Sequence, residues 1–570
     1  MFLRIKPGGK YKYVEIVESY RDPVTKTSIP LTIQRLGRLD KLEEKDPEIL
    51  EKLRAQVAEM NQNANKKKES EKRLEVEKFL SATGGAETKE GYPEKNYGHA
   101  IYRKIWDEMN FDYILRKLQK EHSAATYDLS NTTYLMAISR LLNPGSKLAT
   151  YKKMGNFLWK AEKIEKTDLN HIYRSLDLLA EYKADIEKYT DKRIRKIYKR
   201  ELDVAFYDVT TYAFESVESD GLKEFGYSKD KKFNEVQVVM GLLIDRYGIP
   251  LGYELFPGNT SDYSTLVTIL GQLKEKYKIK KIIITADRGL NSKNNLRLIK
   301  EMGFGYVMAY KIRGATEKIK KEVLNQEGYT WQNDTFRYKV YDYENRIKSK
   351  DGETVLAENL IVTWSETRRR KDEHDRLRLV EKAQKLAEKP GAITAEMKKG
   401  GRKYLKPEKE KIQFEVNYEQ IEYDAQFDGY YGIETSELSL SASEIIEIYH
   451  GLWKIEESFR VLKTDLEARP CFVWTEKRIK GHFVMCFIAL TIQRILEYRL
   501  GCADCHLSTA KIIEGLSSAN LLVYSEKTRP VYLKIANNPD FDLILSAFSM
   551  TPLFSRNTRK DIRDIIALQI

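Results

Sequence analysis

The sequence predicts a multidomain α/β protein, and three observations support that prediction. The chain has 570 residues, more than a single hydrophobic core usually holds. Residues 99–200 have helical patterns throughout, whereas residues 201–310 alternate between strand-like and helix-like segments. Hydrophobic residues make up 42% and charged residues 32% of the chain, which is typical of a globular protein with a densely charged surface.

The charge balance indicates a polyanionic partner. Lysine and arginine number 98 against 85 acidic residues, which gives a formal net charge of +13. Such an excess favours DNA or RNA as the partner and, less strongly, a membrane surface. A lysine-rich composition without such a partner remains an alternative at this point.

Targeting and cysteine patterns favour the cytoplasm. Met1–Lys10 has no apolar core region, so we expect no signal peptide. The longest apolar run, His482–Ile492, is too short to span a bilayer, and we expect a buried helix there. Four cysteines form no disulfide framework. We expect a bacterial cytoplasmic, nucleoid-associated protein with no membrane partner and no small-molecule substrate.

One cysteine motif needs an interpretation. Cys502-Ala-Asp-Cys505-His506 matches the attachment pattern of c-type haem, but that chemistry requires export. A zinc site would need two more ligands, and Cys471 and Cys486 are candidates only by their proximity in sequence. We interpret the spacing as incidental.

The N-terminal region divides into two predicted parts. Residues 1–40 form a small β unit, with strands expected over Tyr11–Glu18 and Ser28–Leu36. Residues 41–98 form a charged helical connector, which ends in a glycine-containing boundary at residues 81–98.

Residues 99–200 predict a helical domain, which we assign to DNA binding. Asp168 is well placed as the N-cap of one helix. The apolar positions of that helix are Leu169, Ile172, Leu176 and Leu179. Asp191–Arg200 is a strongly basic helix that either lies along phosphates or forms a solvated face, and the sequence leaves both readings open.

Residues 201–310 predict the first part of a catalytic core. The expected strands are Leu202–Phe214, Asn234–Asp245, Leu251–Phe256, Lys281–Ala286 and Phe304–Tyr310. The expected helices are Asp262–Tyr277 and Asn291–Met302. This β-β-β-α-β-α-β order is that of the ribonuclease H-like fold.

Residues 311–440 predict a β-rich insertion into that core. Its expected strands are Tyr329–Tyr343, Asn359–Trp364 and Gln413–Tyr423, with a charged helix over Thr367–Lys389. Residues 441–500 complete the core with helices over Ser441–Leu466 and Lys477–Leu500, and residues 501–570 form a C-terminal helical region.

Two aspartates occupy positions that suit metal-dependent phosphodiester chemistry. Two divalent ions about 3.5–4 Å apart stabilise both the attacking and the leaving oxygen, and such ions prefer carboxylate ligands. Asp208 lies within an apolar strand, where an unpaired carboxylate is costly to bury. Asp287 directly follows the apolar strand Ile282–Ala286, and ligands of α/β sheets bind at such strand ends. Either residue alone also suits a capping or turn role.

A third carboxylate lies on the helix predicted over Ser441–Leu466. At about 100° per residue, Tyr449, Leu452, Glu456, Arg460 and Lys463 fall within an arc of roughly 80°. The neighbouring apolar stripe contains Ile455, Phe459, Leu462 and Leu466. An amphipathic helix with a Glu456–Arg460 ion pair is the structural alternative. Glu457 competes for the role of ligand, but we prefer Glu456 because Glu457 lies on the far side of the cluster from the apolar stripe.

These blocks resemble bacterial insertion-sequence DDE transposases of the type-four class, whose signature is Y-(2)-R-(3)-E-(6)-K. Tyr449, Glu456 and Lys463 match it, whereas Leu452 stands at the usual arginine position. Trp453–Lys463 matches the branch with the pattern W-x-I-E-x-x-F-R-x-L-K. The first aspartate block is Tyr207-Asp-Val-Thr-Thr211, the second is Ala286-Asp-Arg-Gly289, and Gly258-Asn-Thr-Ser-Asp262 also resembles a family block.

The resemblance implies a ribonuclease H-like core and two Mg²⁺ or Mn²⁺ ions held by Asp208, Asp287 and Glu456. Asp208 would contact both ions, and each of the other two carboxylates would hold one. The implied reaction cleaves the DNA strand at the element's end and joins the freed 3′-OH to target DNA. The implied partners are double-stranded DNA, as terminal inverted repeats and target, and a second copy of the chain that bridges two ends.

The resemblance also implies DNA contacts from the signature helix. Lys463 and Arg460 would contact phosphate oxygens, and Tyr449 would bond or pack near the cut. Trp453 would stack on an unpaired base, although core packing is the preferred interpretation. We interpret His482 as structural. Two alternatives to a transposase are a ribonuclease H-like nuclease that cuts without joining and a transposase-derived DNA-binding protein without chemistry, for which Leu452 gives some support.

Overall fold

The computed structural model covers the chain with several gaps in what it describes. The described residues are 1–21, 28–61, 93–159, 161–200, 202–216, 218–226, 235–275, 277, 282–286, 289–349, 352–387, 405–407, 414–469, 471–526 and 529–566. They divide into two compact units. The first consists of residues 1–94, 522–535 and 553–561, and the second consists of residues 95–521, 536–552 and 562–570.

The first unit begins with a three-stranded antiparallel sheet. Strands β1 (Phe2–Gly8), β2 (Tyr11–Arg21) and β3 (Ser28–Arg38) pair in chain order. The strands expected at 11–18 and 28–36 are confirmed. β1 was missed: its alternating segment Leu3-Arg4-Ile5-Lys6 is short and ends at Pro7 and Gly8, and the strand is mostly exposed. Helix α1 (Leu39–Lys45) and helical residues 49–61 follow, and the remainder of the predicted connector up to residue 92 lies outside the described residues.

The C-terminal segment is not purely helical, so the expectation for residues 501–570 was wrong. It contains α19 (Thr509–Ser518), β16 (Asn520–Glu526), β17 (Arg529–Lys534), α20 (Pro539–Ala547), β18 (Arg556–Thr558) and α21 (Arg559–Ile566). β17 and β18 pair antiparallel. These strands are short, and their pairing partners are distant in sequence, so local periodicity gives little sign of them.

Residues 99–198 of the second unit are helical. The elements are α3 (His99–Met109), α4 (Phe111–His122), α5 (Leu129–Leu142), α6 (Lys147–Lys153), α7 (Ala161–Glu165), α8 (Leu169–Glu181) and α9 (Lys183–Tyr198). The predicted N-cap of α8 is confirmed: the Asp168 side chain accepts from the His171 amide at 2.9 Å, and the His171 ring accepts from the Asp168 amide. This reciprocal capping fixes the start of the helix.

Several cations of the basic segment 191–200 have partners within the protein. Arg193 donates to the Glu108 carbonyl oxygen at 2.8 Å, and Arg195 pairs with Asp191 at 2.9 Å. Arg200 is buried and pairs with Asp191 and with Asp245, the latter at 3.2 Å. These contacts favour a structural role for this part of the segment over a free phosphate-binding face.

A sheet of nine described strands forms the centre of the second unit. Its strand order is β10-β11-β12-β15-β9-β8-β5-β6-β7. The bounds are β5 (Val204–Ala213), β6 (Gln237–Asp245), β7 (Pro250–Pro257), β8 (Ile283–Ala286), β9 (Gly305–Tyr310), β10 (Thr330–Asn333), β11 (Phe336–Ser349), β12 (Gly352–Ser365) and β15 (Tyr430–Thr435). β8 pairs parallel with both β5 and β9. The strands expected between residues 201 and 310 are confirmed.

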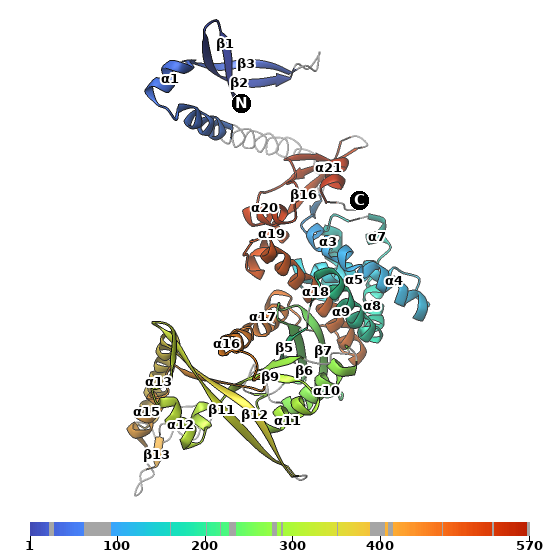
Figure 1. Cartoon of the computed structure of the whole chain (residues 1–570). Helices are drawn as coiled ribbons and strands as arrows, with labels where there is room; N and C mark the ends of the chain where they lie inside the picture. The colour runs from blue at the N-terminus through green and yellow to red at the C-terminus, as the bar shows by residue number, and fades with distance from the viewer. Residues whose placement is uncertain are drawn as a thin grey trace. The chain divides into compact units, whose positions relative to one another are not determined.

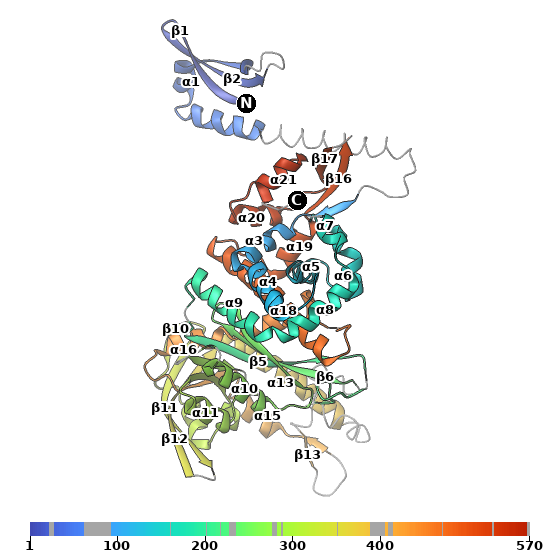
Figure 2. The ribbon, with the colours of Figure 1, turned by 90° about the vertical axis from the view of Figure 1, so that its right-hand side faces the viewer.

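Helices cover both faces of this sheet (Figures 1 and 2). α10 (Asp262–Glu275) and α11 (Lys293–Glu301) pack on one face, where Tyr207 and Leu266 belong to the same apolar cluster. On the other face, α17 (Trp453–Arg460) contacts β5 and β6. Because side chains alternate along a strand, Asp208 points to the face opposite Tyr207.

α18 (Glu476–Cys502) is a core helix of the second unit. Its bounds confirm the helix expected over Lys477–Leu500, and the whole helix is long and apolar enough to cross a membrane. In its most apolar stretch, 94% of the residues are buried inside the protein, which agrees with the predicted buried helix. Gly481 permits close packing, because a Cβ there would overlap the backbone carbonyl of Leu176 in α8.

The segment between β9 and β15 extends the central sheet. β11 and β12 form a long hairpin, and β12 pairs antiparallel with β15 (Figure 1). Helices α12 (Glu317–Leu324) and α13 (Glu366–Ala387) lie in the same segment. The strand expected over Gln413–Tyr423 was wrong. The described part contains the short strand β14 (Phe414–Val416) and then helix α15 (Tyr418–Ala425), which begins with a hydrogen bond from the Gln420 amide to the Asn417 side chain.

Candidate active site

Strand β5 positions the first predicted carboxylate. Asp208 lies at its centre, and its Oδ1 accepts a hydrogen bond from the Val209 amide at 2.7 Å. The side chain is half-buried, whereas its neighbours in the strand are buried. The Asp208 side chain is therefore partly covered by the protein and partly accessible to solvent.

The register of β5 and β8 aligns the two aspartate blocks. Tyr207 pairs with Ala286 across the parallel strands. Asp208 follows the first of these residues in the chain, and Asp287 follows the second. Asp287 itself lies outside the described residues. The structure therefore gives the strand register only up to Ala286, the residue before it.

The segment that carries the third carboxylate is not one continuous helix, as expected for Ser441–Leu466. Helix α16 (Ala442–His450) ends at Gly451, α17 begins at Trp453, and residues Val461–Asp465 form a π-helical turn. Gly451 lies against the Phe206 ring of β5, so that an added Cβ would overlap the ring. The interruption therefore brings the start of α17 onto the strand that carries Asp208.

Glu456 and Glu457 differ in their surroundings. Glu456 is exposed and makes no hydrogen bond or ion pair with any described residue. Glu457 lies 3.5 Å from the Arg494 guanidinium of α18, whose side chain is only 6% exposed. Arg494 also donates to the Ser458 hydroxyl at 3.1 Å and pairs with Glu497. Glu457 thus contributes to anchoring α17 on α18, while Glu456 remains available to a ligand.

The apolar stripe predicted for this segment is confirmed. Ile455, Phe459, Leu462 and Leu466 are all buried. The ion pair expected between Glu456 and Arg460 is not present. Arg460 instead pairs with Glu457 and with Asp465, each at 3.3 Å.

The remaining signature residues surround α17. The Tyr449 hydroxyl hydrogen-bonds to the Tyr431 hydroxyl of β15. The Lys463 ammonium lies 5.6 Å from the centre of the Tyr212 ring at the end of β5.

Leu452 is buried, whereas Trp453 is 56% exposed, so core packing was the wrong interpretation of Trp453. Since a π-helical turn contains more residues than an α-helical turn, Lys463 departs from the arc calculated for a regular helix.

The donor set suits a hard divalent cation. Asp208 and Glu456 provide carboxylate oxygens from a rigid strand and from a helix that contacts this strand. Among the residues that the structure describes, no three His, Cys, Asp or Glu side chains converge, and Asp287 is not among those residues. The carboxylate oxygens of Asp208 and Glu456 are the type of ligand that Mg²⁺ and Mn²⁺ prefer.

His482 is buried and has protein partners on both ring nitrogens. Nε2 lies 3.2 Å from the Ala468 carbonyl oxygen, and Nδ1 lies 3.0 Å from the Lys147 ammonium. Burial lowers the pKa of His482 well below its usual value, and nearby Lys147 adds to this effect. Burial and protein contacts on both ring nitrogens agree with the structural role expected for His482.

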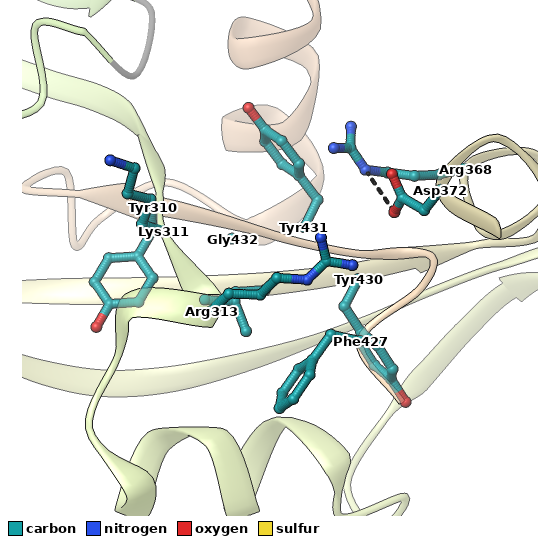
Figure 3. A pocket seen from close by; sticks show the side chains of 10 residues that line it. Tyr310, Lys311, Arg313, Arg368, Asp372, Phe427, Tyr430, Tyr431 and Gly432 are labelled. Carbon is teal, nitrogen blue, oxygen red and sulfur yellow. Dashed lines mark ion pairs between the residues drawn. The ribbon is translucent and has the colours of Figure 1, made fainter. Parts of the chain in front are cut away.

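A basic pocket adjoins Tyr431 and was not expected from the sequence. It has about 430 Å³ of empty volume and is lined by Tyr310, Lys311, Ile312, Arg313, Arg368, Asp372, Phe427, Tyr430, Tyr431 and Gly432. Figure 3 shows its cations and tyrosines together, with Arg368 paired to Asp372. The Arg368 guanidinium lies 4.4 Å from the centre of the Tyr431 ring. The pocket combines lysine and arginine with aromatic rings, which is the side-chain chemistry that binds nucleic acid.

Only part of this pocket has a signal in the sequence. The basic run Arg368–Lys371 marks one wall. Arg313 and Tyr431 come from segments 118 positions apart, whose proximity results from the pairing of β9 with β15. Long-range strand pairing of this kind cannot be read from local periodicity.

The model of the family described as "Transposase DDE domain" matches residues 199–492. This match covers more than half of the chain, and it includes the strands β5 and β8 and the helix α17. The chain belongs to the transposase DDE domain family. A second family model, described as "IS1634 family transposase, N-terminal domain", matches residues 3–72 of this transposase. No curated protein matches the chain.

The two matches agree with the division of the chain. The DDE domain match begins at Lys199, directly after α9, and ends within α18. All three predicted carboxylates therefore lie inside it. The N-terminal match contains the sheet β1–β3 and α1. A transposase acts on DNA, in agreement with the net charge of +13.

Proposed function

We propose that this DDE transposase cleaves DNA at the ends of an insertion sequence and joins the freed 3′-OH to target DNA. The observation that carries the proposal is the convergence of β5, β8 and α17. Tyr207 and Ala286 are paired residues that directly precede Asp208 and Asp287, and α17 packs on β5 with Glu456 exposed. We assign Asp208, Asp287 and Glu456 as the catalytic carboxylates.

The central strands support a ribonuclease H-like core. The elements β5, β6, β7, α10, β8, α11 and β9 follow one another in the β-β-β-α-β-α-β order expected from the sequence pattern. In the sheet their strand order is β9-β8-β5-β6-β7, with β6 and β7 antiparallel to their neighbours and β8 parallel to β5. Residues 311–440 are then an insertion between the second and third carboxylates. The insertion also contributes strands β10, β11, β12 and β15 to the same sheet.

Asp208, Asp287 and Glu456 would hold two Mg²⁺ or Mn²⁺ ions. Such ions, when bound, neutralise charge at the scissile phosphate and favour an oxygen nucleophile. Burial of the strand around Asp208 fixes the direction of its carboxylate, while α17 is anchored by its buried stripe and by Glu457. The strand that carries Asp208 and the helix that carries Glu456 are thus held in place before DNA binds, which reduces reorganisation during the reaction.

Cations and aromatic rings near α17 would hold the DNA. Lys463 lies at the end of β5, and Lys311, Arg313 and Arg368 line the pocket beside Tyr431. Their charges suit phosphate oxygens, and the exposed Trp453 suits stacking on a base. The family signature has arginine where this chain has buried Leu452, so a phosphate contact at that position must come from other cations.

A cleavage and joining assay tests the function. The substrate is a labelled duplex that carries the element's end, incubated with Mg²⁺ and a supercoiled target plasmid. We expect cleavage at the end and transfer of the labelled strand into the plasmid. Cleavage without joining would support a nuclease instead, and binding without cleavage would support a DNA-binding descendant of a transposase.

A further inference from the structure

A buried polar cluster lies on the sheet face that α11 covers, where the insertion hairpin joins the core. Glu358 of β12 and Glu434 of β15 are each only 2% exposed. Leu360 pairs with Glu434, so Glu358, two positions away, lies on the same face as Glu434. The surrounding residues on this face are mainly apolar or aromatic, including Tyr306, Met308, Ile347 and Leu356.

Each of the two carboxyl groups has a fixed neutral donor. The Tyr306 hydroxyl donates to Glu358 Oε1, and the Asn291 amide nitrogen donates to Glu434 Oε1. Asn291 is itself held by the Ala309 carbonyl oxygen at 2.5 Å. The cation that faces the pair is Lys293 of α11, whose ammonium donates to the Arg346 carbonyl oxygen at 3.0 Å.

One buried oxygen atom of this cluster, Asn345 Oδ1, accepts no hydrogen bond from a described residue, and Asn345 is 3% exposed. The side chain of Asn345 borders Glu358. Glu358 and Glu434 hydrogen-bond to each other and therefore share one proton, which a divalent cation would displace. A buried oxygen without a partner costs roughly 1–3 kcal/mol, which a bound ligand would offset.

The oxygens require positive charge to compensate them. Two buried carboxylates that are both ionised repel each other strongly, so either a proton or a cation must lie between them. Burial raises the pKa of Glu358 to about 7 and that of Glu434 to about 8, the latter also because of the charge of Glu358. A donor set made only of carboxylate and amide oxygens selects a hard cation rather than zinc or copper.

We propose that Glu358, Glu434 and Asn345 form a binding site for one hard divalent cation, separate from the catalytic carboxylates. The site lies on the Tyr207 face of the sheet, whereas Asp208 points to the opposite face. Its ligands come from β11, β12 and β15. The bound cation therefore ties the hairpin β11–β12 to β15, the strand that pairs with the core strand β9, and stabilises this junction.

The test uses Mn²⁺ and the full chain with its catalytic carboxylates neutralised by Asp208→Asn, Asp287→Asn and Glu456→Gln. Free Mn²⁺ is measured by electron paramagnetic resonance during a titration. We expect one Mn²⁺ per chain to remain bound, and the addition of Glu434→Gln or Glu358→Gln to weaken this binding at least tenfold. Because catalysis is already removed, the result does not depend on the proposed function.

Two further variants separate a cation site from a structural role of these residues. Asn345→Asp adds a third carboxylate, and we expect it to strengthen Mn²⁺ binding about tenfold, which loss of packing would not do. Glu187→Gln removes another buried carboxylate, one that pairs with Lys183 at 3.2 Å, and should leave Mn²⁺ binding unchanged. The proposal is overturned if the neutralised chain binds no Mn²⁺, or if Glu434→Gln and Glu358→Gln bind it as tightly as their parent.

Discussion

Glu456 and Glu457 are neighbours in the chain, yet the structure gives them different tasks. Glu456 is exposed and forms no ion pair with any described residue, whereas Glu457 faces the buried Arg494 of α18. The sequence pattern favoured Glu456 from its angular position alone. The contacts of Glu457 supply the physical reason, because a ligand carboxylate must remain free of a competing ion pair.

The two residues therefore predict opposite mutational effects. Glu456→Gln should lower DNA cleavage at least a hundredfold without changing the melting temperature, because it removes a metal ligand and no protein contact. Glu457→Gln should lower the free energy of unfolding by about 1–2 kcal/mol while retaining most cleavage, because it breaks a partly buried ion pair. Cleavage rates and thermal unfolding of both variants check this, and reversed effects would transfer the ligand role to Glu457.

Lys147 is a buried lysine with no carboxylate partner among the described residues. Its ammonium lies 3.0 Å from His482 Nδ1, and burial lowers its pKa to about 7, with Arg140 contributing to the same effect. The unfolded chain gives lysine a pKa near 10.4. Between these two values the unfolded state binds more protons than the folded state, so the stability rises with pH.

Lys147→Met should remove this pH dependence. Between pH 7 and pH 10, the unfolding free energy of the wild type should rise by on the order of 4 kcal/mol more than that of the variant. Urea unfolding at several pH values measures it, with the exposed Lys192→Met as control. Parallel pH profiles for wild type and Lys147→Met would show that Lys147 stays charged in the folded protein.

At the scale of elements, the break between α16 and α17 decides how the third carboxylate meets the sheet. The hydrophobic spacing predicted one helix over 441–466, and the buried stripe from Ile455 to Leu466 shows why that prediction was nearly right. The periodicity could not reveal the interruption, since it arises from the contact of Gly451 with Phe206, a residue 245 positions earlier.

A pair of glycine substitutions tests this contact. Gly451→Ala should destabilise the protein by about 1–3 kcal/mol and lower cleavage, because the added methyl group overlaps Phe206 and displaces α17 from β5. Gly271→Ala in α10 adds a methyl group with no atom within 4 Å, and should stabilise by about 0.5–1 kcal/mol. Equal effects of the two substitutions in thermal unfolding would exclude the proposed role of Gly451.

At the scale of the whole molecule, the sequence predicted the core strands better than the insertion. β5 to β9 are local segments with continuous apolar runs, and their order along the chain determines most of their pairing. Strand β15 and the short helix α15 were missed because their contacts, with β9, β12 and α13, come from distant segments. The basic pocket beside Tyr431 depends on these same contacts.

The net charge of +13 predicts strongly salt-dependent DNA binding. Binding releases counterions from the phosphates, so the logarithm of the affinity should fall linearly with the logarithm of salt concentration, with a slope of about −0.9 for each phosphate contacted. Removal of a single cation, by Lys463→Ala or Arg313→Ala, should reduce that slope by about one. Filter binding at 50–300 mM salt checks it, and a flat response would exclude phosphate contacts as the main source of affinity.

The central claim is that three carboxylates from distant segments hold metal ions together. Fe²⁺ bound in place of Mg²⁺ generates hydroxyl radicals with peroxide and ascorbate, and these cut the polypeptide only near the metal. Mass spectrometry should show cuts close to positions 208, 287 and 456, all lost together in Asp208→Asn. Cuts that are confined to one of these segments, or that persist unchanged in Asp208→Asn, would contradict a shared metal site.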